Sequence, residues 1–144
     1  MSGIIMPVTP LLAVDALMLH RVKLTVIERL CNPHGLAWPG GFVDVGETVE
    51  QAMVREVLEE TNLESEIVEL IGTYSEPNRD PRGHVVSIVF LCRSAGCRSA
   101  MPKDDASDLR FFTIQNALKI KMEFDHNQML LDALDRTSLN RRRI

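Results

Sequence analysis

The sequence predicts an α+β fold in which helices pack against a mixed β-sheet. Segments with strand periodicity and segments with helical periodicity follow one another without the regular alternation of a doubly wound parallel sheet. Apolar residues make up 45% of the chain and charged residues 25%, which is typical of a globular protein with a buried core. The length of 144 residues fits one domain, and we expect a single domain over residues 1–144.

The first third of the chain predicts two strands and an extended segment that contains a pair of glycines. Residues 11–19 and 23–28 are short apolar or alternating runs, a pattern typical of strands. Residues 36–43 follow a turn cluster rich in Asn, Pro and Gly, and we expect them to be extended, with an interruption at Gly40 and Gly41.

The clearest helix is predicted over residues 48–61. Thr48 and Gln51 have the spacing of a capping box, in which each side chain accepts a hydrogen bond from the backbone amide of the other residue. The segment contains no Gly or Pro. Asn62 follows it at the position where a helix commonly ends in a left-handed residue.

The second half of the chain predicts three more strands and a last helix. The strands are expected at residues 67–74, 84–92 and 109–113, with a loop containing two prolines between the first two. Asp125 and Gln128 again have capping spacing, and apolar residues follow at helical intervals. We therefore expect Asp125 to open the last helix.

The composition excludes several classes of protein. Sixteen basic and twenty acidic residues give a formal charge of −4, so the chain lacks the basic surplus of a general nucleic-acid binder. The most apolar stretch, residues 4–19, is interrupted by two prolines and an aspartate, so we expect neither a membrane span nor a signal peptide. The three cysteines lack paired spacings, which indicates a reducing, cytoplasmic location rather than a disulfide or zinc scaffold.

The predicted first helix carries a cluster of acidic residues. Glu56, Glu59 and Glu60 are neighbours on the helix surface because they are three and four positions apart. A solvated acidic face is one interpretation. The preceding glycines favour another, because Gly40 or Gly41 can bring a backbone carbonyl close to an ion held by the carboxylates. Carboxylate, carbonyl and water oxygens are the ligands that Mg²⁺ prefers.

The spacing of residues 41–63 resembles the Nudix box, a motif of many fixed positions over about 23 residues. The resemblance is carried by Gly41, Glu47, Arg55-Glu56-Val57, Glu59-Glu60 and Asn62-Leu63. Asn62 stands where the family usually has Gly, and both residues tolerate a left-handed helix end. The resemblance implies the Nudix fold, an α/β/α sandwich with a mixed central sheet, and hydrolysis of a nucleoside diphosphate linked to another group.

The resemblance also implies roles for the residues of the motif. The positions of the metal ligands are occupied by Glu56, Glu59 and Glu60. A carbonyl of Gly40 or Gly41 is expected to complete the site, which would hold Mg²⁺ or Mn²⁺. Glu47 and Arg55 look like the pair that holds the loop against the helix.

The general base has two possible origins in such enzymes. One is a glutamate of the motif, here Glu56, and the other is a carboxylate of a later loop. Residues 102–108 lie in the corresponding region and offer Asp104, Asp105 and Asp108, of which Asp105 is our candidate. An ordinary solvated turn is the alternative interpretation of this loop.

Residues 74–84 resemble the segment that follows the Nudix box in the ADP-ribose pyrophosphatase branch, whose characteristic proline corresponds to Pro77. Residues 14–16 and 124–126 look like this branch as well. Arg79 and Arg82 are the candidate substrate-binding residues, since guanidinium groups suit phosphate oxygens. The alternative is a rigid loop with solvated arginines. The resemblance implies hydrolysis of ADP-ribose to AMP and ribose 5-phosphate, and a homodimer.

Other functions remain open at this point. Other Nudix substrates include oxidised dNTPs, dinucleotide polyphosphates and RNA ends, the last prompted by Arg136 and the arginines at 141–143. A sensor that binds ADP-ribose without cleaving it belongs to a different class, and such domains usually lack some of the acidic residues of the motif. This chain keeps them all, and we therefore expect an enzyme with a small nucleotide substrate and no nucleic-acid partner.

Overall fold

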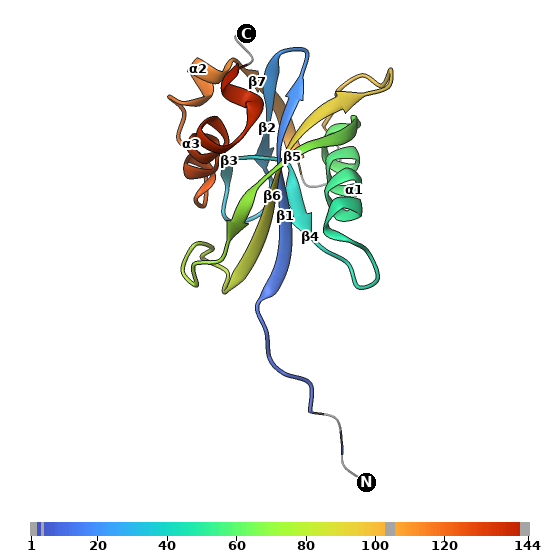
Figure 1. Cartoon of the computed structure of the whole chain (residues 1–144), viewed down its shortest axis with the longest axis vertical. Helices are drawn as coiled ribbons and strands as arrows, with labels where there is room; N and C mark the ends of the chain where they lie inside the picture. Colours follow the sequence, from blue (N-terminus) through green and yellow to red (C-terminus); the bar gives the residue numbers. More distant parts are fainter. Residues whose placement is uncertain (1–2, 4, 103–105, 142–144) are drawn as a thin grey trace.

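A computed structural model describes residues 3, 5–102 and 106–141, which form a mixed seven-stranded sheet with helices on both faces (Figure 1). The strands are β1 (Leu11–His20), β2 (Lys23–Arg29), β3 (Gly35–Ala37), β4 (Gly40–Phe42), β5 (Glu64–Tyr74), β6 (Val85–Ala95) and β7 (Ala106–Phe112). The helices are α1 (Val49–Thr61), α2 (Ile114–Ala117), α3 (His126–Arg136) and a 3₁₀ turn, η1 (Ser138–Arg141). The predicted α+β fold with a mixed central sheet and flanking helices is confirmed.

Strand β1 lies in the middle of the sheet, whose main order is β3-β2-β1-β6-β5. It runs parallel to β6 and antiparallel to both β2 and β4. The first half of β1 pairs with β4, where Asp15 lies opposite Gly40, and its end pairs with β2, where Met18 lies opposite Thr25. β1 and β2 therefore separate along their length, and β4 with its paired glycines occupies the position beside β1.

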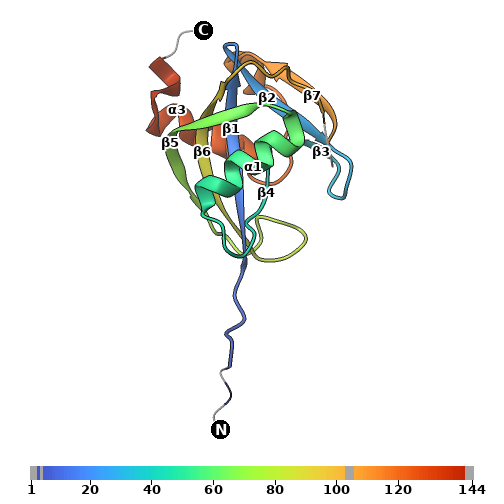
Figure 2. The same ribbon diagram turned by 90° about the vertical axis from the view of Figure 1, so that its right-hand side faces the viewer.

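Side chains of β1 alternate between two cores on opposite faces of the sheet. Ala16 and Met18 pack towards α1, which lies across one face of the sheet (Figure 2). Leu17 and Leu19 pack towards α3 on the opposite face. Because both faces of β1 are buried, its sequence is a nearly continuous apolar run rather than an alternating one.

The predicted ends of α1 are confirmed. The Thr48 hydroxyl accepts a hydrogen bond from the Gln51 amide at 3.1 Å, and the Gln51 side-chain oxygen accepts one from the Thr48 amide at 2.9 Å. Asn62 adopts a left-handed conformation with φ of 62°, and its amide donates to the Leu58 carbonyl. These local contacts fix the start and direction of the helix that carries the acidic cluster.

The last helix departs from the prediction at its first turn. Asp125 occupies the position before α3, but its side chain makes no capping hydrogen bond. Its two carboxylate oxygens accept hydrogen bonds from Arg79 instead. An ion pair with a residue 46 positions away thus replaces the local cap that the spacing predicts.

Strand β5 is longer than predicted, because it begins at Glu64 rather than at residue 67. The additional residues are polar, and they pair with the end of β6 through Glu64 opposite Ala95 and Glu66 opposite Arg93. None of the helices in the described residues is long and apolar enough to cross a membrane. Residues 5–10 extend away from the sheet in line with the start of β1 (Figures 1 and 2).

Candidate active site

A cavity of about 380 Å³ lies where β1, β4 and α1 meet the start of α3. Among its lining residues are the carboxylates of Asp15, Asp44, Glu56, Glu60 and Asp80, and the guanidinium groups of Arg29, Arg79 and Arg82. Trp38, Phe42 and Phe124 contribute aromatic surface. The cavity therefore combines a strongly acidic wall with three cationic side chains, a combination suited to a cation and an anion bound side by side.

The glycine pair of β4 allows the backbone to approach the acidic helix closely. A Cβ atom on Gly41 would lie 2.5 Å from both carboxylate oxygens of Glu56, and one on Gly40 would lie 2.5 Å from Asp15 Oδ1. The Gly40 amide donates a hydrogen bond to Glu60 Oε2 at 3.2 Å. Only residues without a side chain fit between β1 and α1 at these positions.

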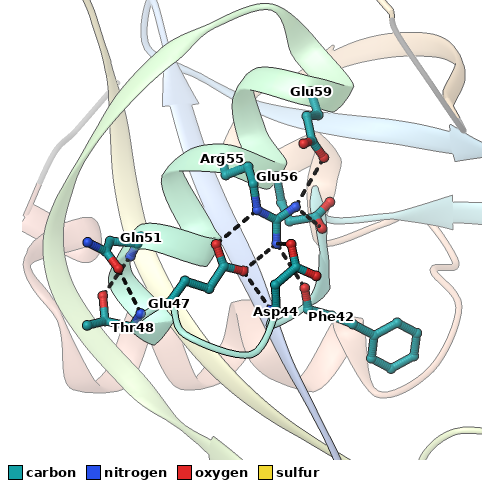
Figure 3. Close-up of polar contacts among 8 residues, drawn as sticks. All are labelled: Phe42, Asp44, Glu47, Thr48, Gln51, Arg55, Glu56 and Glu59. Carbon is teal, nitrogen blue, oxygen red and sulfur yellow. Dashed lines mark hydrogen bonds and ion pairs between the residues drawn. The ribbon is translucent and has the colours of Figure 1, made fainter.

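Arg55 is the centre of the polar contacts that join the loop before α1 to the helix (Figure 3). Its guanidinium donates to both carboxylate oxygens of Glu47, at 2.5 and 3.0 Å, and to the Phe42 carbonyl at 3.0 Å. These bonds and the Asp44 amide lower the pKa of Glu47 to about 2. The same guanidinium contacts Glu56 at 2.8 Å and Glu59 at 3.2 Å. Arg55 thus orients three glutamates at once.

Glu56 and Glu60 are the helix carboxylates that line the cavity. Burial raises the pKa of Glu56, although the neighbouring Arg55 opposes the shift. Burial also raises the pKa of Glu60 well above its ordinary value, and the charges of Glu56 and Asp15 add to the effect. In both residues the main cause is the removal of the carboxylate from water, which disfavours the charged form unless a cation lies close to it.

The donor set of this wall fits a hard divalent cation. Glu56 and Glu60 supply carboxylate oxygens beside the backbone of Gly40 and Gly41. The described part of the chain contains no ready-formed group of three or more His, Cys, Asp or Glu ligands. Carboxylate and carbonyl oxygens of this kind fit an ion such as Mg²⁺, which keeps several water ligands and accepts substrate oxygens in addition to a few protein groups. Glu59 lies outside the cavity wall, and its side chain is 45% exposed.

The two arginines predicted to bind substrate both line the cavity, but each is paired with a carboxylate. Arg79 forms a two-bond ion pair with Asp125 at 2.7 and 2.9 Å, and its side chain is only 4% exposed. Arg82 contacts the buried Asp80 at 2.8 Å. Pro77 is exposed on the same loop and is not part of the cavity wall. Arg79 thus joins its loop to α3.

Arg29 is a cavity residue that the sequence interpretation missed. Its Nε donates to the Pro33 carbonyl at 2.8 Å, and no carboxylate among the described residues forms an ion pair with it. Its guanidinium lies 5.2 Å from the ring centre of Phe124, and the guanidinium of Arg82 lies 5.5 Å from the same ring. Cation–π contacts hold both groups in place without neutralising them. A single arginine at the end of a strand gives no sequence signal for such a role.

A second group that the sequence interpretation missed surrounds Asp15. Its carboxylate accepts a hydrogen bond from the Ser87 hydroxyl at 2.5 Å, and its other oxygen lies 3.5 Å from His126 Nε2. All three residues are buried. No local pattern predicts this group, because Trp38 and Asp15, which contact the His126 imidazole, are 88 and 111 positions away in the sequence.

The candidate bases of the later loop cannot be compared with Glu56, because Asp104 and Asp105 lie outside the described residues. Asp108 is exposed in β7, where its side chain accepts a hydrogen bond from the Leu109 amide at 2.9 Å. It does not line the cavity.

Acidic side chains lie beside a glycine backbone, and across the cavity lies an arginine that forms no ion pair with any described residue. Together they define a candidate site for a divalent cation and a phosphate ester. The chain belongs to the NUDIX domain family, which matches residues 9–133. An ADP-ribose pyrophosphatase of Methanocaldococcus jannaschii is 45% identical over 125 residues, which are 85% of this chain and 72% of that protein.

Solved structures agree with this assignment. A MutT/nudix family protein from Enterococcus faecalis superposes with a TM-score of 0.81 at 27% identity, covering 94% of this chain and 64% of that one. A bifunctional NMN adenylyltransferase/ADP ribose pyrophosphatase from Francisella tularensis, complexed with AMP and a manganese ion, superposes with a TM-score of 0.74 at 27% identity. That match covers 88% of this chain and 42% of the other, so the chain spans less than two thirds of either solved structure.

Proposed function

We propose that this protein hydrolyses ADP-ribose to AMP and ribose 5-phosphate and requires Mg²⁺, for which Mn²⁺ can substitute. The observation that carries the proposal is the close approach of Gly40 and Gly41 to Glu60 and Glu56 inside a cavity that also holds Arg29, which has no ion-pair partner in the part of the chain that the structure describes. The pyrophosphatase relative from M. jannaschii supports the choice of substrate, and the manganese ion and AMP in the F. tularensis structure support the metal and the product.

Glu56 and Glu60 would hold the cation, with a carbonyl of the glycine pair as a further ligand. A divalent cation bound there would neutralise the diphosphate and make a coordinated water more acidic. Glu47 and Arg55 keep the loop and α1 together, and Arg55 orients Glu56 and Glu59. In this proposal Glu59 does not contact the cation directly: it helps to hold Arg55 and can reach the cation through a water molecule.

Arg29 is the side chain best placed to bind the diphosphate. Its Nη donors form no ion pair among the described residues, whereas Arg79 and Arg82 are paired with Asp125 and Asp80. Phosphate oxygens are strong acceptors for a guanidinium, and a guanidinium stacked on an aromatic ring loses little freedom on binding. Arg82 is half-exposed and can assist, while Arg79 orients the loop that carries it and Pro77.

The proton acceptor in this proposal is Glu56 or Asp105. Glu56 lines the cavity, and burial raises its pKa towards the range useful to a general base. Substituting Glu56→Gln and Asp105→Asn separately distinguishes the two. The residue that acts as the base should lower kcat by at least about tenfold when it is replaced. If neither substitution does so, both assignments are wrong.

The decisive experiment is to incubate the purified chain with ADP-ribose and Mg²⁺ and to identify the products by ³¹P NMR and chromatography. We expect AMP and ribose 5-phosphate, and no turnover in the presence of EDTA until Mg²⁺ or Mn²⁺ is restored. Dinucleotide polyphosphates, oxidised dNTPs and capped RNA serve as competing substrates. Faster cleavage of any of them would replace ADP-ribose as the substrate, and tight binding of ADP-ribose without products would indicate a sensor.

We also propose that the protein is a cytoplasmic homodimer, as the resemblance to the ADP-ribose pyrophosphatase branch suggests. Light scattering coupled to size-exclusion chromatography measures the mass directly. A mass equal to that of one chain at micromolar concentration would exclude the homodimer without affecting the proposed reaction.

A further inference from the structure

We propose that His126 is a positioning residue for the glycine pair, acting through the backbone amide of Trp38. His126 lies at the start of α3 and lines the same cavity as the glycine pair and the acidic helix. The proposal rests on the proposed hydrolase function, because it assigns to His126 a part in aligning the same site. It concerns contacts within the protein that neither the motif nor the relatives assign.

The side chain of His126 is fixed by its contacts. Its Nδ1 accepts a hydrogen bond from the Trp38 amide at 3.0 Å, and its backbone carbonyl accepts one from the Trp38 indole at 2.9 Å. A backbone amide can only donate, so Nδ1 must be unprotonated and the ring proton lies on Nε2. Nε2 in turn lies 3.5 Å from Asp15 Oδ1, an acceptor that Ser87 holds in place. The imidazole thus presents an acceptor to Trp38 and a donor to Asp15.

Gly40 and Gly41 are paired with Asp15 and Val14 of β1, and three further contacts hold residues 38–40 on both sides. Trp38 donates to His126, the Pro39 carbonyl accepts from the Ala16 amide at 2.8 Å, and Gly40 donates to Glu60 at 3.2 Å. Because Pro39 has no amide hydrogen, the Trp38 amide is the donor immediately before the glycines. Removing the acceptor on His126 leaves that buried amide unpaired. Trp38 and Pro39 lie outside the pairing of β4 with β1, so they can then shift and displace the start of β4 relative to Glu60.

His126 is also connected to the loop that contains the candidate substrate residues. Asp125, its neighbour, forms the two-bond ion pair with Arg79, and this pair takes the place of a helix cap. The ring of Phe124, two positions before His126, contacts the guanidinium groups of both Arg29 and Arg82. Phe124 therefore contacts the arginines, Asp125 contacts the loop, and His126 contacts the segment that leads into the glycine pair. Of the three, only His126 contacts the part of the chain that borders the proposed metal site.

Two substitutions separate the contacts of the imidazole. In His126→Asn the side-chain oxygen occupies the position of Nδ1, so the acceptor for Trp38 remains and the donor towards Asp15 is lost. In His126→Gln the side-chain amide reaches the position of Nε2, so the donor remains and the acceptor for Trp38 is lost. Both variants are uncharged and polar, which makes each the control for the other.

The readouts are steady-state kinetics with ADP-ribose and the fluorescence of Trp38, the single tryptophan of the chain. We expect His126→Asn to keep kcat within about threefold of the wild type. His126→Gln should lower kcat by about 10- to 100-fold with KM changed less than threefold, since a displacement of about 1 Å has that effect on a reacting geometry. The emission maximum should shift in the Gln variant only.

Equal losses in both variants, or a larger loss in His126→Asn, would overturn the proposal. Should the Gln variant fail to fold, ¹⁵N NMR of the wild-type imidazole decides, because a protonated Nδ1 is incompatible with the Trp38 contact. A wild-type protein that leaves ADP-ribose intact would refute the proposed function alone. The tautomer and the fluorescence difference would still test the placement of Trp38.

Discussion

The close approach of Gly41 to Glu56 can be tested by adding a single methyl group. In Gly41→Ala the new Cβ would lie 2.5 Å from both carboxylate oxygens of Glu56, whereas ordinary contact begins at 3.4 Å. The carboxylate must therefore move by about 0.9 Å. Arg55 also contacts this carboxylate, so the movement disturbs the contact between Arg55 and Glu56 as well.

The expected result is a folded protein with little activity. A displacement of about 1 Å at a reacting centre lowers turnover roughly 100-fold, so we expect kcat to fall by about that factor. The free energy of unfolding should fall by about 1–3 kcal/mol, the usual cost of overpacking, which leaves the protein folded. Product formation from ADP-ribose and urea unfolding measure the two quantities.

Gly72→Ala is the matched control. Its Cβ would lie 3.0 Å from Arg136 Nη1, the end of a long, half-exposed side chain that can move, and Gly72 is in β5 outside the cavity wall. This variant should retain wild-type kcat. If Gly41→Ala also retains kcat within threefold, the glycine backbone and Glu56 do not act together as inferred here.

Two further predictions concern the ion pairs that support the site. The folded-state pKa of Glu47, about 2, is below its ordinary value of 4.5, so its stabilising contribution is complete above pH 4.5 and is lost as the pH falls towards 2. The difference in unfolding free energy between wild type and Glu47→Gln should shrink over that range in urea titrations, and a constant difference would contradict the assignment. Asp125→Asn should lower the free energy of unfolding by about 3 kcal/mol, since it leaves the buried Arg79 guanidinium without its counter-charge. An unchanged urea midpoint in that variant would show that water or another carboxylate replaces Asp125.

Sequence periodicity was most informative where structure depends on neighbours a few positions apart. The capping box of Thr48 and Gln51 and the left-handed Asn62 were predicted correctly, because both ends of α1 are determined within four residues. The same reasoning was wrong at Asp125, where the competing partner Arg79 belongs to a different loop. Spacing along the chain identifies a nearby backbone amide as a possible partner for a carboxylate, but it does not reveal a guanidinium that is close only in the folded protein.

The acidic cluster shows a similar division. Spacing placed Glu56, Glu59 and Glu60 on one arc of the helix, as the structure does. The position of β4 decides which of them line the cavity: Glu56 and Glu60 face the glycines, and Glu59 is turned to solvent and to Arg55. Helical periodicity predicts which side chains are neighbours on the surface of α1. The strand that packs beside the helix, β4, determines which of those side chains are covered.

The order of residues along the chain was sufficient to predict an α+β protein with a capped acidic helix behind a glycine pair, and its motif identified the family. Those features depend on short-range backbone geometry and residue type. Only the folded chain brought Asp15, Arg29, Trp38 and His126 around one cavity. The contacts of these residues join β1, β2, the segment before β4 and α3. These elements are far apart in the sequence and become neighbours only when the sheet and α3 pack together, which no local pattern predicts.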